Sequence, residues 1–363
     1  MHTACVLSKK EEQARIFEVG TANPHARFSQ KDMPDFIGIS DPKLRKFFEH
    51  NHIQYRYFYL PAHANFTDII GKEKFHDLLD RFVDGAQSIT KKAVLNCISK
   101  AKISHDEIDF ICCVTSTGFI VPSLSARLIK YLNFREDCQR VDIVGMGCSA
   151  GLNGLNTVAS WCHTHPNKNA LLICVEICSA IYAVDNTPRT AVVNSLFGDG
   201  AAVALVKYDT HIKDKQNYPK IIDFESHLLP AHLNELRFDW DNEKGCYNFY
   251  VGKNTPRLIS AVVDQPISRL LKRNKLQKKK IKHWILHGGG NSVLTGIRDK
   301  LNLSDDDLRH TRSVLRDFGN LSSGSFLFSF KRLIEEESIS PGDLGVIITM
   351  GPGLAIELAL LAW

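Results

Sequence analysis

The sequence predicts an α/β fold in which one structural unit occurs twice and mixed sheets are covered by helices on both faces. Two observations carry this prediction. Segments such as ALLICVE (170–176) and LGVIITMG (344–351) are apolar throughout and alternate with helical segments, which is typical of strands buried on both faces. Residues 93–176 and 266–351 also follow one plan at an almost constant offset, so we expect two similar halves.

Each copy opens with a helix, a polar turn and a strand. AVLNCISKAKISHDEIDFICCVTSTG (93–118) has apolar residues at helical spacing before a strand, and PISRLLKRNKLQKKKIKHWILHGGG (266–290) repeats this order. Each copy then reaches a Gly-rich segment that opens another helix, at GMGCSAGLNGLNTV (145–158) and DFGNLSSGSFLFSF (317–330). The apolar strands named above complete the two copies.

A polar stretch between the copies predicts where the halves divide. YDTHIKDKQN (208–217) follows an apolar strand, so we assign residues 1–210 to the first half and residues 211–363 to the second. Residues 221–254 alternate between apolar and polar positions and contain many turn formers, which predicts antiparallel strands and loops.

The composition excludes several function classes. The chain has 363 residues, 44% hydrophobic content and a net charge of +5, all ordinary for a globular protein. The basic run 270–284 lacks interleaved aromatic residues and is interpreted as a solvated helix face rather than a nucleic-acid site. No apolar run has the length of a signal peptide or a membrane span, so we expect a cytoplasmic protein without membrane contact.

The ten cysteines show no spacing typical of a metal site. Without a secretion signal they are predicted to be reduced and mostly buried thiols. One of them differs in its setting: Cys148 follows a strand and opens a helix between Gly147 and Gly151. The positive end of the helix dipole favours a thiolate there. The alternative is a small thiol packed in a crowded core.

Two other candidates lie at corresponding joints. His287 ends the strand of the second copy and precedes three glycines, and Asn320 opens the helix whose counterpart carries Cys148. A pseudo-twofold axis would bring the two helix starts together. Histidine can pair with a thiolate, and the amide of asparagine can donate to an oxyanion. Considered singly, strand capping by His287 and helix capping by Asn320 are the simpler interpretations.

A serine hydrolase is the rival hypothesis. GCSAG (147–151) matches G-x-S-x-G with Ser149 as nucleophile, and HGGG (287–290) matches the oxyanion loop of lipases. In hydrolases that loop precedes the nucleophile, whereas here it follows. His310, in a charged segment, is the only histidine left after it. The chain order therefore argues against this hypothesis.

Cys, His and Asn distributed over two similar halves resemble the thiolase-type condensing enzymes. HGGG, SLFGDGAA (195–202) and MGPGLAIE (350–357) narrow the resemblance to the type III polyketide synthases, the chalcone synthase family. The resemblance extends from Gly20 to the C-terminus. It implies a thiolase-like, five-layer αβαβα fold. Motifs such as DIVGMGC (142–148) look most like a bacterial subfamily that makes 3,5-dihydroxyphenylacetyl-CoA.

The resemblance implies roles for the three candidates. Cys148 would carry the growing chain as a thioester, and His287 would hold it as a thiolate in an ion pair. His287 and Asn320 together would bind the thioester oxygen of malonyl-CoA. Further positions match the family's substrate-binding sites: Phe197 where the CoA tunnel meets the cavity, Gly351, Pro352 and Gly353 in the family's Gly-Pro-Gly loop, Val121 on a loop that crosses to a partner subunit, and Lys43 and Lys46 at the CoA phosphates. Ser322 is a small residue that suits an apolar cavity closed to water.

The expected activity is iterative decarboxylative condensation of malonyl-CoA followed by cyclisation, with 3,5-dihydroxyphenylacetyl-CoA as the expected product. Other starters leading to resorcinol, pyrone or naphthalene products stay open, as does a ketoacyl-ACP synthase III-like activity. A non-catalytic ketosynthase-like partner is disfavoured because Cys, His and Asn are all present. The resemblance implies no cofactor beyond the CoA thioesters, a homodimer, and accessory proteins similar to enoyl-CoA hydratases.

Overall fold

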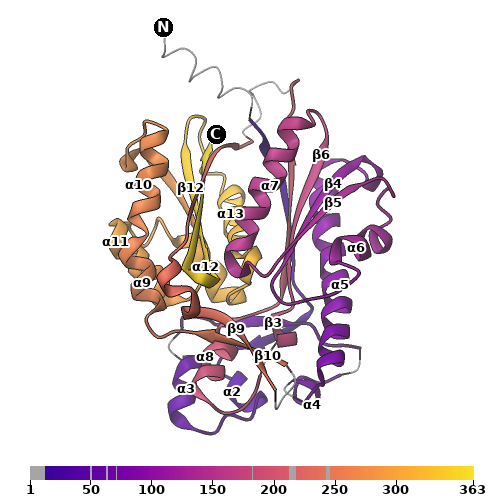
Figure 1. The fold of residues 1–363 in the computed structure, drawn as a ribbon, viewed down its shortest axis with the longest axis vertical. Coiled ribbons are helices and arrows are strands. Elements are labelled where there is room, and N and C mark those ends of the chain that lie inside the picture. Colours follow the sequence, from indigo (N-terminus) through magenta and orange to yellow (C-terminus); the bar gives the residue numbers. More distant parts are fainter. Residues whose placement is uncertain are drawn as a thin grey trace.

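The computed structural model describes residues 13–49, 51–62, 64–70, 72–181, 183–211, 218–242 and 246–363. Figure 1 shows two parts with the same layering side by side and a smaller layer of helices and short strands at their lower end. The predicted division at residues 210 and 211 stays a prediction, and residues 212–217 of the polar stretch lie outside the described residues.

The first part alternates strands and helices as the sequence predicts. Its elements are β1 (Arg15–Ala22), α5 (Phe75–Ala101), β4 (Ile108–Thr115), α6 (Leu124–Leu132), β5 (Gln139–Val144), α7 (Ala150–Thr164), β6 (Asn169–Glu176) and β7 (Gly200–Lys207). The second part comprises β8 (Lys220–His227), α9 (Thr255–Val262), α10 (Asp264–Arg273), β11 (Ile281–Leu286), α11 (Asn291–Leu301), α12 (Arg309–Phe318), α13 (Ser325–Glu335), β12 (Leu344–Gly351) and β13 (Ala355–Ala362).

The described strands of both parts form one nine-stranded sheet in the order β11-β12-β13-β8-β1-β7-β6-β4-β5. In the first part β4 and β6 are parallel, and β6, β7 and β1 pair antiparallel. In the second part β11 and β12 are parallel, and β12, β13 and β8 pair antiparallel. Order and direction repeat, which confirms the duplication, and β5 alone among these strands has no counterpart. Antiparallel pairing of β1 with β8, at Arg15 and Lys220, joins the two halves of the sheet.

Three hydrophobic cores fill the spaces between five layers, and the central core packs both sheet halves against the middle helices α7 and α13. Alternate residues of β4 face different cores: Cys112 packs with α7 and α13 between the sheet halves, whereas Ile111 and Cys113 pack under α5 and α6. A third core lies between the second sheet half and α9, α10 and α11. In Figure 1 α7 and α13 run between the halves, and α5 and α10 cover the outer faces. The predicted αβαβα architecture is confirmed.

A smaller layer closes one end of the sheets. It consists of β2 (Ala26–Ser29), α2 (Met33–Phe36), α3 (Pro42–Glu49), β3 (Tyr55–Phe58), α4 (Phe66–Ile69), α8 (Pro188–Leu196), β9 (Leu236–Asp241) and β10 (Cys246–Val251). β9 and β10 pair antiparallel within 221–254, as the alternation predicts. In Figure 1 this layer lies beneath the starts of α7 and α13, so it forms the floor of the region where Cys148 and Asn320 meet.

Two expectations on charge and apolarity can be compared with the structure. The basic run 270–284 covers the end of α10, a turn and the start of β11, and its lysines are exposed. This confirms the interpretation as a solvated face. Within the described ranges no helix combines the length and the apolar character that crossing a bilayer requires.

Candidate active site

Cys148 lies in a tight turn between β5 and α7. The turn η2 (Gly147–Ser149) leads directly into α7. Gly145 and Gly147 have φ angles of +85° and +66°, which residues with a side chain adopt rarely. A Cβ atom at Gly147 would also lie 2.2 Å from Cδ of Pro352. The sequence therefore uses glycine here to reverse the chain and to admit Pro352.

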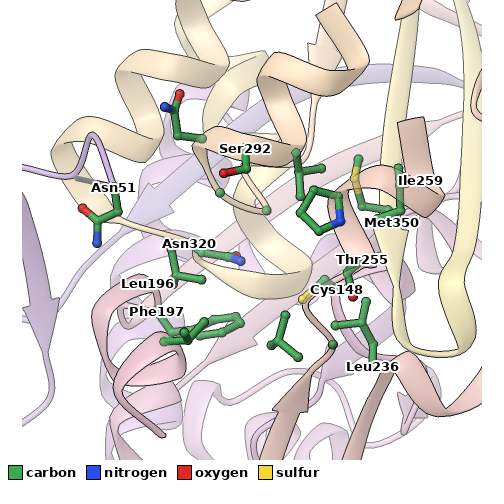
Figure 2. A pocket seen from close by; sticks show the side chains of 18 of the residues that line it. Asn51, Cys148, Leu196, Phe197, Leu236, Thr255, Ile259, Ser292, Asn320 and Met350 are labelled. Carbon is green, nitrogen blue, oxygen red and sulfur yellow. The ribbon is translucent and has the colours of Figure 1, made fainter. Parts of the chain in front are cut away.

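Asn320 lies in the corresponding turn before α13. Its Oδ1 accepts hydrogen bonds from the Ser322 N–H (2.8 Å) and the Ser325 hydroxyl (3.4 Å). These two bonds fix the carbonyl end of the amide. Figure 2 shows the amide nitrogen of Asn320 directed toward the side of the cavity where the Cys148 sulfur lies. The side chain is therefore oriented as a donor toward the thiol.

The two helix starts meet, as the duplication predicts. Sγ of Cys148 lies 3.5 Å from Oγ of Ser322. A Cβ atom at Gly151 would lie 2.2 Å from the carbonyl oxygen of Ser323. The glycine thus provides the clearance for the close approach of α7 and the turn before α13. Gly151 therefore serves the approach of the two helix starts, whereas Gly147 makes room for Pro352.

His287 follows β11 and is buried. Its backbone N–H donates to the Ile348 carbonyl at 2.8 Å, which continues the pairing of β11 with β12. Its Nδ1 atom is buried and has no hydrogen-bond partner among the described residues. Since buried polar atoms are nearly always paired in folded proteins, such an atom is typical of a functional site.

A cavity of about 430 Å³ brings these side chains together. Cys148, His287 and Asn320 all line it, and apolar side chains such as Leu236 and Ile259 form much of its wall. Figure 2 shows Cys148, Phe197 and Asn320 around one space. A much smaller second cavity also touches Cys148, and Ser322 and Cys178 line it. Phe197 borders both cavities.

Burial dominates the electrostatics of the site. It raises the pKa of the Cys148 thiol to about 12, against the lowering effect of the Ser322 hydroxyl. It lowers the pKa of the His287 imidazole to about 4. The expectation that the helix dipole favours a thiolate therefore does not hold for Cys148 alone, because desolvation penalises the anion more strongly. When both ions form together, opposite charges lie in one cavity, and each lowers the free-energy cost of the other.

The structure separates the predicted binding residues into three groups. Phe197, Gly351, Pro352 and Lys46 line the large cavity with the three candidates. Ser322 lines the small one. The remaining three line neither cavity: Gly353, which turns the chain with a φ angle of +75°, the exposed Lys43, and Val121, whose relative exposure is 96%.

The sequence analysis missed Glu176, which ends β6 behind the two helix starts. Its carboxylate is fully buried and accepts hydrogen bonds from Thr117 Oγ1 (2.8 Å), the Ser116 N–H (2.9 Å) and Ser323 Oγ (2.6 Å). Burial raises its pKa, and its charge contributes to the raised pKa of Cys148. The available clue was an acidic residue closing the otherwise apolar strand ALLICVE.

The described cysteines and acidic residues form no metal centre. Across the described ranges, no three or more His, Cys, Asp or Glu side chains are grouped as metal ligands would be. The eight cysteines whose side chains are described are all free and buried, which confirms for them the prediction of buried thiols.

Comparison with known proteins identifies the family. Residues 227–362 match the family described as "Chalcone and stilbene synthases, C-terminal domain", and residues 60–222 match "FAE1/Type III polyketide synthase-like protein". The chain is 42% identical over 359 residues to the 3,5-dihydroxyphenylacetyl-CoA synthase of Amycolatopsis balhimycina, covering 99% of this chain and 95% of that protein. The Streptomyces toyocaensis protein of the same name is 42% identical over 351 residues, covering 96% and 90%.

More distant relatives share the fold. The 1,3,6,8-tetrahydroxynaphthalene synthase of Streptomyces peucetius subsp. caesius is 28% identical and covers 96% of this chain and 93% of its own. The crystal structure of PKS-I from the brown alga Ectocarpus siliculosus superposes with a TM-score of 0.88 at 23% identity, covering 96% and 98%. The type III polyketide synthase domain of Steely1 from Dictyostelium gives 0.86 at 26% identity, covering 96% and 99%. This chain therefore belongs to the type III polyketide synthases, the condensing acyltransferases of the chalcone and stilbene synthase family.

Proposed function

We propose that this enzyme condenses malonyl-CoA units iteratively on Cys148 and cyclises the chain to 3,5-dihydroxyphenylacetyl-CoA, with malonyl-CoA serving also as starter. The observation that carries the proposal is the meeting of Cys148, His287 and Asn320 on one largely apolar cavity. The product assignment is supported by the 42% identity to two synthases of that name, against 28% to a tetrahydroxynaphthalene synthase.

The first step is acyl transfer. Cys148 loses its proton to His287 and attacks the thioester carbonyl of the starter, which forms the Cys148 thioester and releases CoA as the thiol. The two neutral groups suit this exchange, because the buried pair becomes charged only as the nucleophile reacts. Ser322 lies 3.5 Å from the sulfur and stabilises the thiolate by its hydroxyl.

The second step is decarboxylation and carbon–carbon bond formation. Malonyl-CoA loses CO₂ and leaves an enolate, whose oxygen accepts hydrogen bonds from His287 and the Asn320 amide. The fixed carbonyl end of Asn320 supports this role, since a donor held in place before the reaction stabilises developing charge without reorganisation. The enolate carbon attacks the Cys148 thioester, which breaks the sulfur–carbon bond and frees Cys148. An apolar cavity keeps water from protonating the enolate.

Labelled malonyl-CoA tests the catalytic assignment. We expect Cys148→Ala to lose the covalent acyl label and all product, whereas Ser149→Ala keeps the label. Ser149 is the matched control because it is the neighbouring buried side chain and the nucleophile of the hydrolase hypothesis. A labelled Cys148→Ala protein or an unlabelled Ser149→Ala protein would refute the assignment of the nucleophile.

Mass spectrometry of the products tests the substrate assignment. The purified enzyme receives malonyl-CoA alone, and we expect 3,5-dihydroxyphenylacetyl-CoA with release of CO₂. A requirement for another acyl-CoA starter, or a naphthalene or pyrone as main product, would overturn the product assignment while leaving the condensing activity intact. Absence of CO₂ release with every acyl-CoA would overturn the proposal as a whole.

We also propose a homodimer formed at the edge strand β5. β5 ends the sheet, and exposed apolar side chains lie at its last residue and in segments next to it: Val144, Met146, Phe119 and Val121. Apolar groups around an unpaired strand edge are typical of an association surface. We expect Val121→Asp to yield monomers in light scattering coupled to size exclusion, and Leu95→Asp, on the exposed side of α5, to leave the dimer intact. A dimeric Val121→Asp protein would refute this interface.

The proposal includes a cytoplasmic location and CoA binding at the cavity mouth. The eight free cysteines support a reducing compartment. Lys46 lines the cavity from α3, where its ammonium group suits the CoA phosphates. Lys43, Gly353 and Val121 stay predictions as substrate-binding residues, and so do accessory proteins similar to enoyl-CoA hydratases.

A further inference from the structure

The C-terminal end of α8 is held by buried hydrogen-bond donors. Helices usually leave their last carbonyl groups to water or to capping groups. Here every carbonyl from Asn194 to Phe197 has a protein donor. The bonds are Arg56 to the Asn194 oxygen (2.5 Å), Gln30 and Asn51 to the Ser195 oxygen (2.8 Å each), the Asn320 N–H to the Leu196 oxygen (2.8 Å) and Arg56 to the Phe197 oxygen (2.9 Å).

Arg56 is the centre of this arrangement. It lies on β3 and is fully buried. One terminal nitrogen bonds both the Asn194 and Phe197 oxygens, and Nε bonds Oε1 of Gln30 at 2.8 Å, which orients Gln30 toward Ser195. A guanidinium group is planar and presents its donors in fixed directions, and a cation at the carbonyl end of a helix is favoured by the helix dipole. Arg56 therefore fixes the helix end in both position and orientation.

The helix end is bonded in turn to a catalytic candidate. Asn320 donates to the Leu196 oxygen and accepts from the Gly198 N–H at 3.0 Å, so the segments around Phe197 and Asn320 pair like adjacent strands. The two segments are packed too closely to admit a side chain at Gly319. A Cβ atom there would lie 2.7 Å from the Leu196 oxygen and 3.0 Å from Cδ of Arg56. A shift of the α8 end would thus move Phe197 and Asn320 together, relative to Cys148 in the turn before α7.

We propose that Arg56 is a positioning residue that aligns the Asn320 amide and Phe197 with Cys148 for carbon–carbon bond formation. The inference rests on the proposed decarboxylative condensation. Loss of CO₂ needs only the enolate oxygen to be held by its donors, whereas condensation also needs the enolate carbon in contact with the Cys148 thioester. A displaced Asn320 therefore impairs condensation more than it impairs the loss of CO₂. The unused enolate takes up a proton, so malonyl-CoA and H⁺ become acetyl-CoA and CO₂.

The test uses Arg56→Lys in the full-length enzyme supplied with malonyl-CoA alone. Lysine keeps the charge but cannot reach the Asn194, Phe197 and Gln30 oxygens together. We expect the ratio of acetyl-CoA to polyketide, measured by mass spectrometry, to rise on the order of tenfold, since small misplacements of reacting groups carry large rate penalties. Arg81→Lys is the matched control: Arg81 is also buried but bonds Glu73 and Ser179, so its loss should lower the thermal midpoint and leave the ratio unchanged.

The outcomes separate the two proposals. An Arg56→Lys ratio equal to wild type, or an equal rise in Arg81→Lys, overturns the positioning role. If Arg56→Lys does not fold, Gln30→Met replaces it in the test, because it removes both the acceptor for Arg56 and the donor to Ser195. A higher ratio of acetyl-CoA to polyketide in Gln30→Met then supports the positioning role, and an unchanged ratio overturns it. A wild-type enzyme that releases no CO₂ overturns the proposed function first. A wild-type enzyme that condenses normally while these variants keep its ratio overturns the positioning role alone.

Discussion

Replacing Gly151 by alanine should damage both stability and catalysis. The new Cβ atom would lie 2.2 Å from the Ser323 oxygen and 2.7 Å from Cε1 of Phe326. Ordinary contacts between such atoms are above 3 Å, so α7 and the turn before α13 must separate by about 1 Å. Overpacking of this kind costs about 1–3 kcal/mol of unfolding free energy. Because Cys148 lies in the turn that leads directly into α7, we expect condensation to slow by about a hundredfold.

Gly324 offers a control at the corresponding helix start. A Cβ atom there has no neighbour closer than 3.7 Å, and its φ angle of −87° suits alanine. Gly324→Ala should leave the structure unstrained and stabilise it by about 0.5 kcal/mol through the lower entropy of the unfolded chain. The two variants therefore add the same methyl group at two similar helix starts, and only the site at Gly151 lacks room for it.

Urea unfolding followed by circular dichroism gives the free energies, and polyketide formation from malonyl-CoA gives the rates. Equal free energies for Gly151→Ala and Gly324→Ala would refute the argument from packing. A destabilised Gly151→Ala enzyme with wild-type rate would refute the link between the separation of the helix starts and catalysis.

Three further predictions follow from the charges. Lys46→Ala should raise KM for malonyl-CoA about fivefold and Lys43→Ala should not, because only Lys46 lines the cavity; equal KM values would contradict the CoA assignment. Ser322→Ala should slow alkylation of Cys148 by iodoacetamide at a fixed pH, since the hydroxyl lowers the thiol pKa. Mass mapping follows the alkylation of Cys148, and a rate equal to that of the wild type would contradict this role of Ser322. Burial raises the pKa of Asp199 from 3.8 to about 6, so between these values the folded state holds a proton that the unfolded state lacks, and stability falls by about 3 kcal/mol as pH rises. Asp199→Asn should flatten urea-unfolding free energies over this window, and an unchanged slope would exclude Asp199 as the source.

The sequence indicated much of the fold because the duplicated pattern is local. Each strand and helix of the repeat is visible in its own residues, and superposing the copies already pairs Cys148 with Asn320. Lys43 and Lys46 show the limit of local patterns. Both lie on α3, yet only Lys46 lines the cavity, because the packing of α3 against α8 decides which side chain reaches it.

Long-range contacts account for what the sequence did not indicate. Glu176 bonds Ser323, and Arg56 bonds Asn194, across separations of 147 and 138 residues. No periodicity encodes such pairs. The pKa of the Cys148 thiol is higher than the helix dipole alone predicts, and this too depends on long-range contacts. The helix dipole is a local property of the turn, whereas desolvation depends on everything packed around Cys148.

Strand β5 has a kinetic consequence. It is the strand without a counterpart in the second half, it ends the sheet, and only Gly145, Met146 and Gly147 separate it from Cys148. A partner subunit seated on this edge would immobilise the segment that holds the nucleophile. Dilution into monomers would free that segment, so the turnover per active site should fall with decreasing enzyme concentration, and the midpoint of that fall would report the dissociation constant of the dimer.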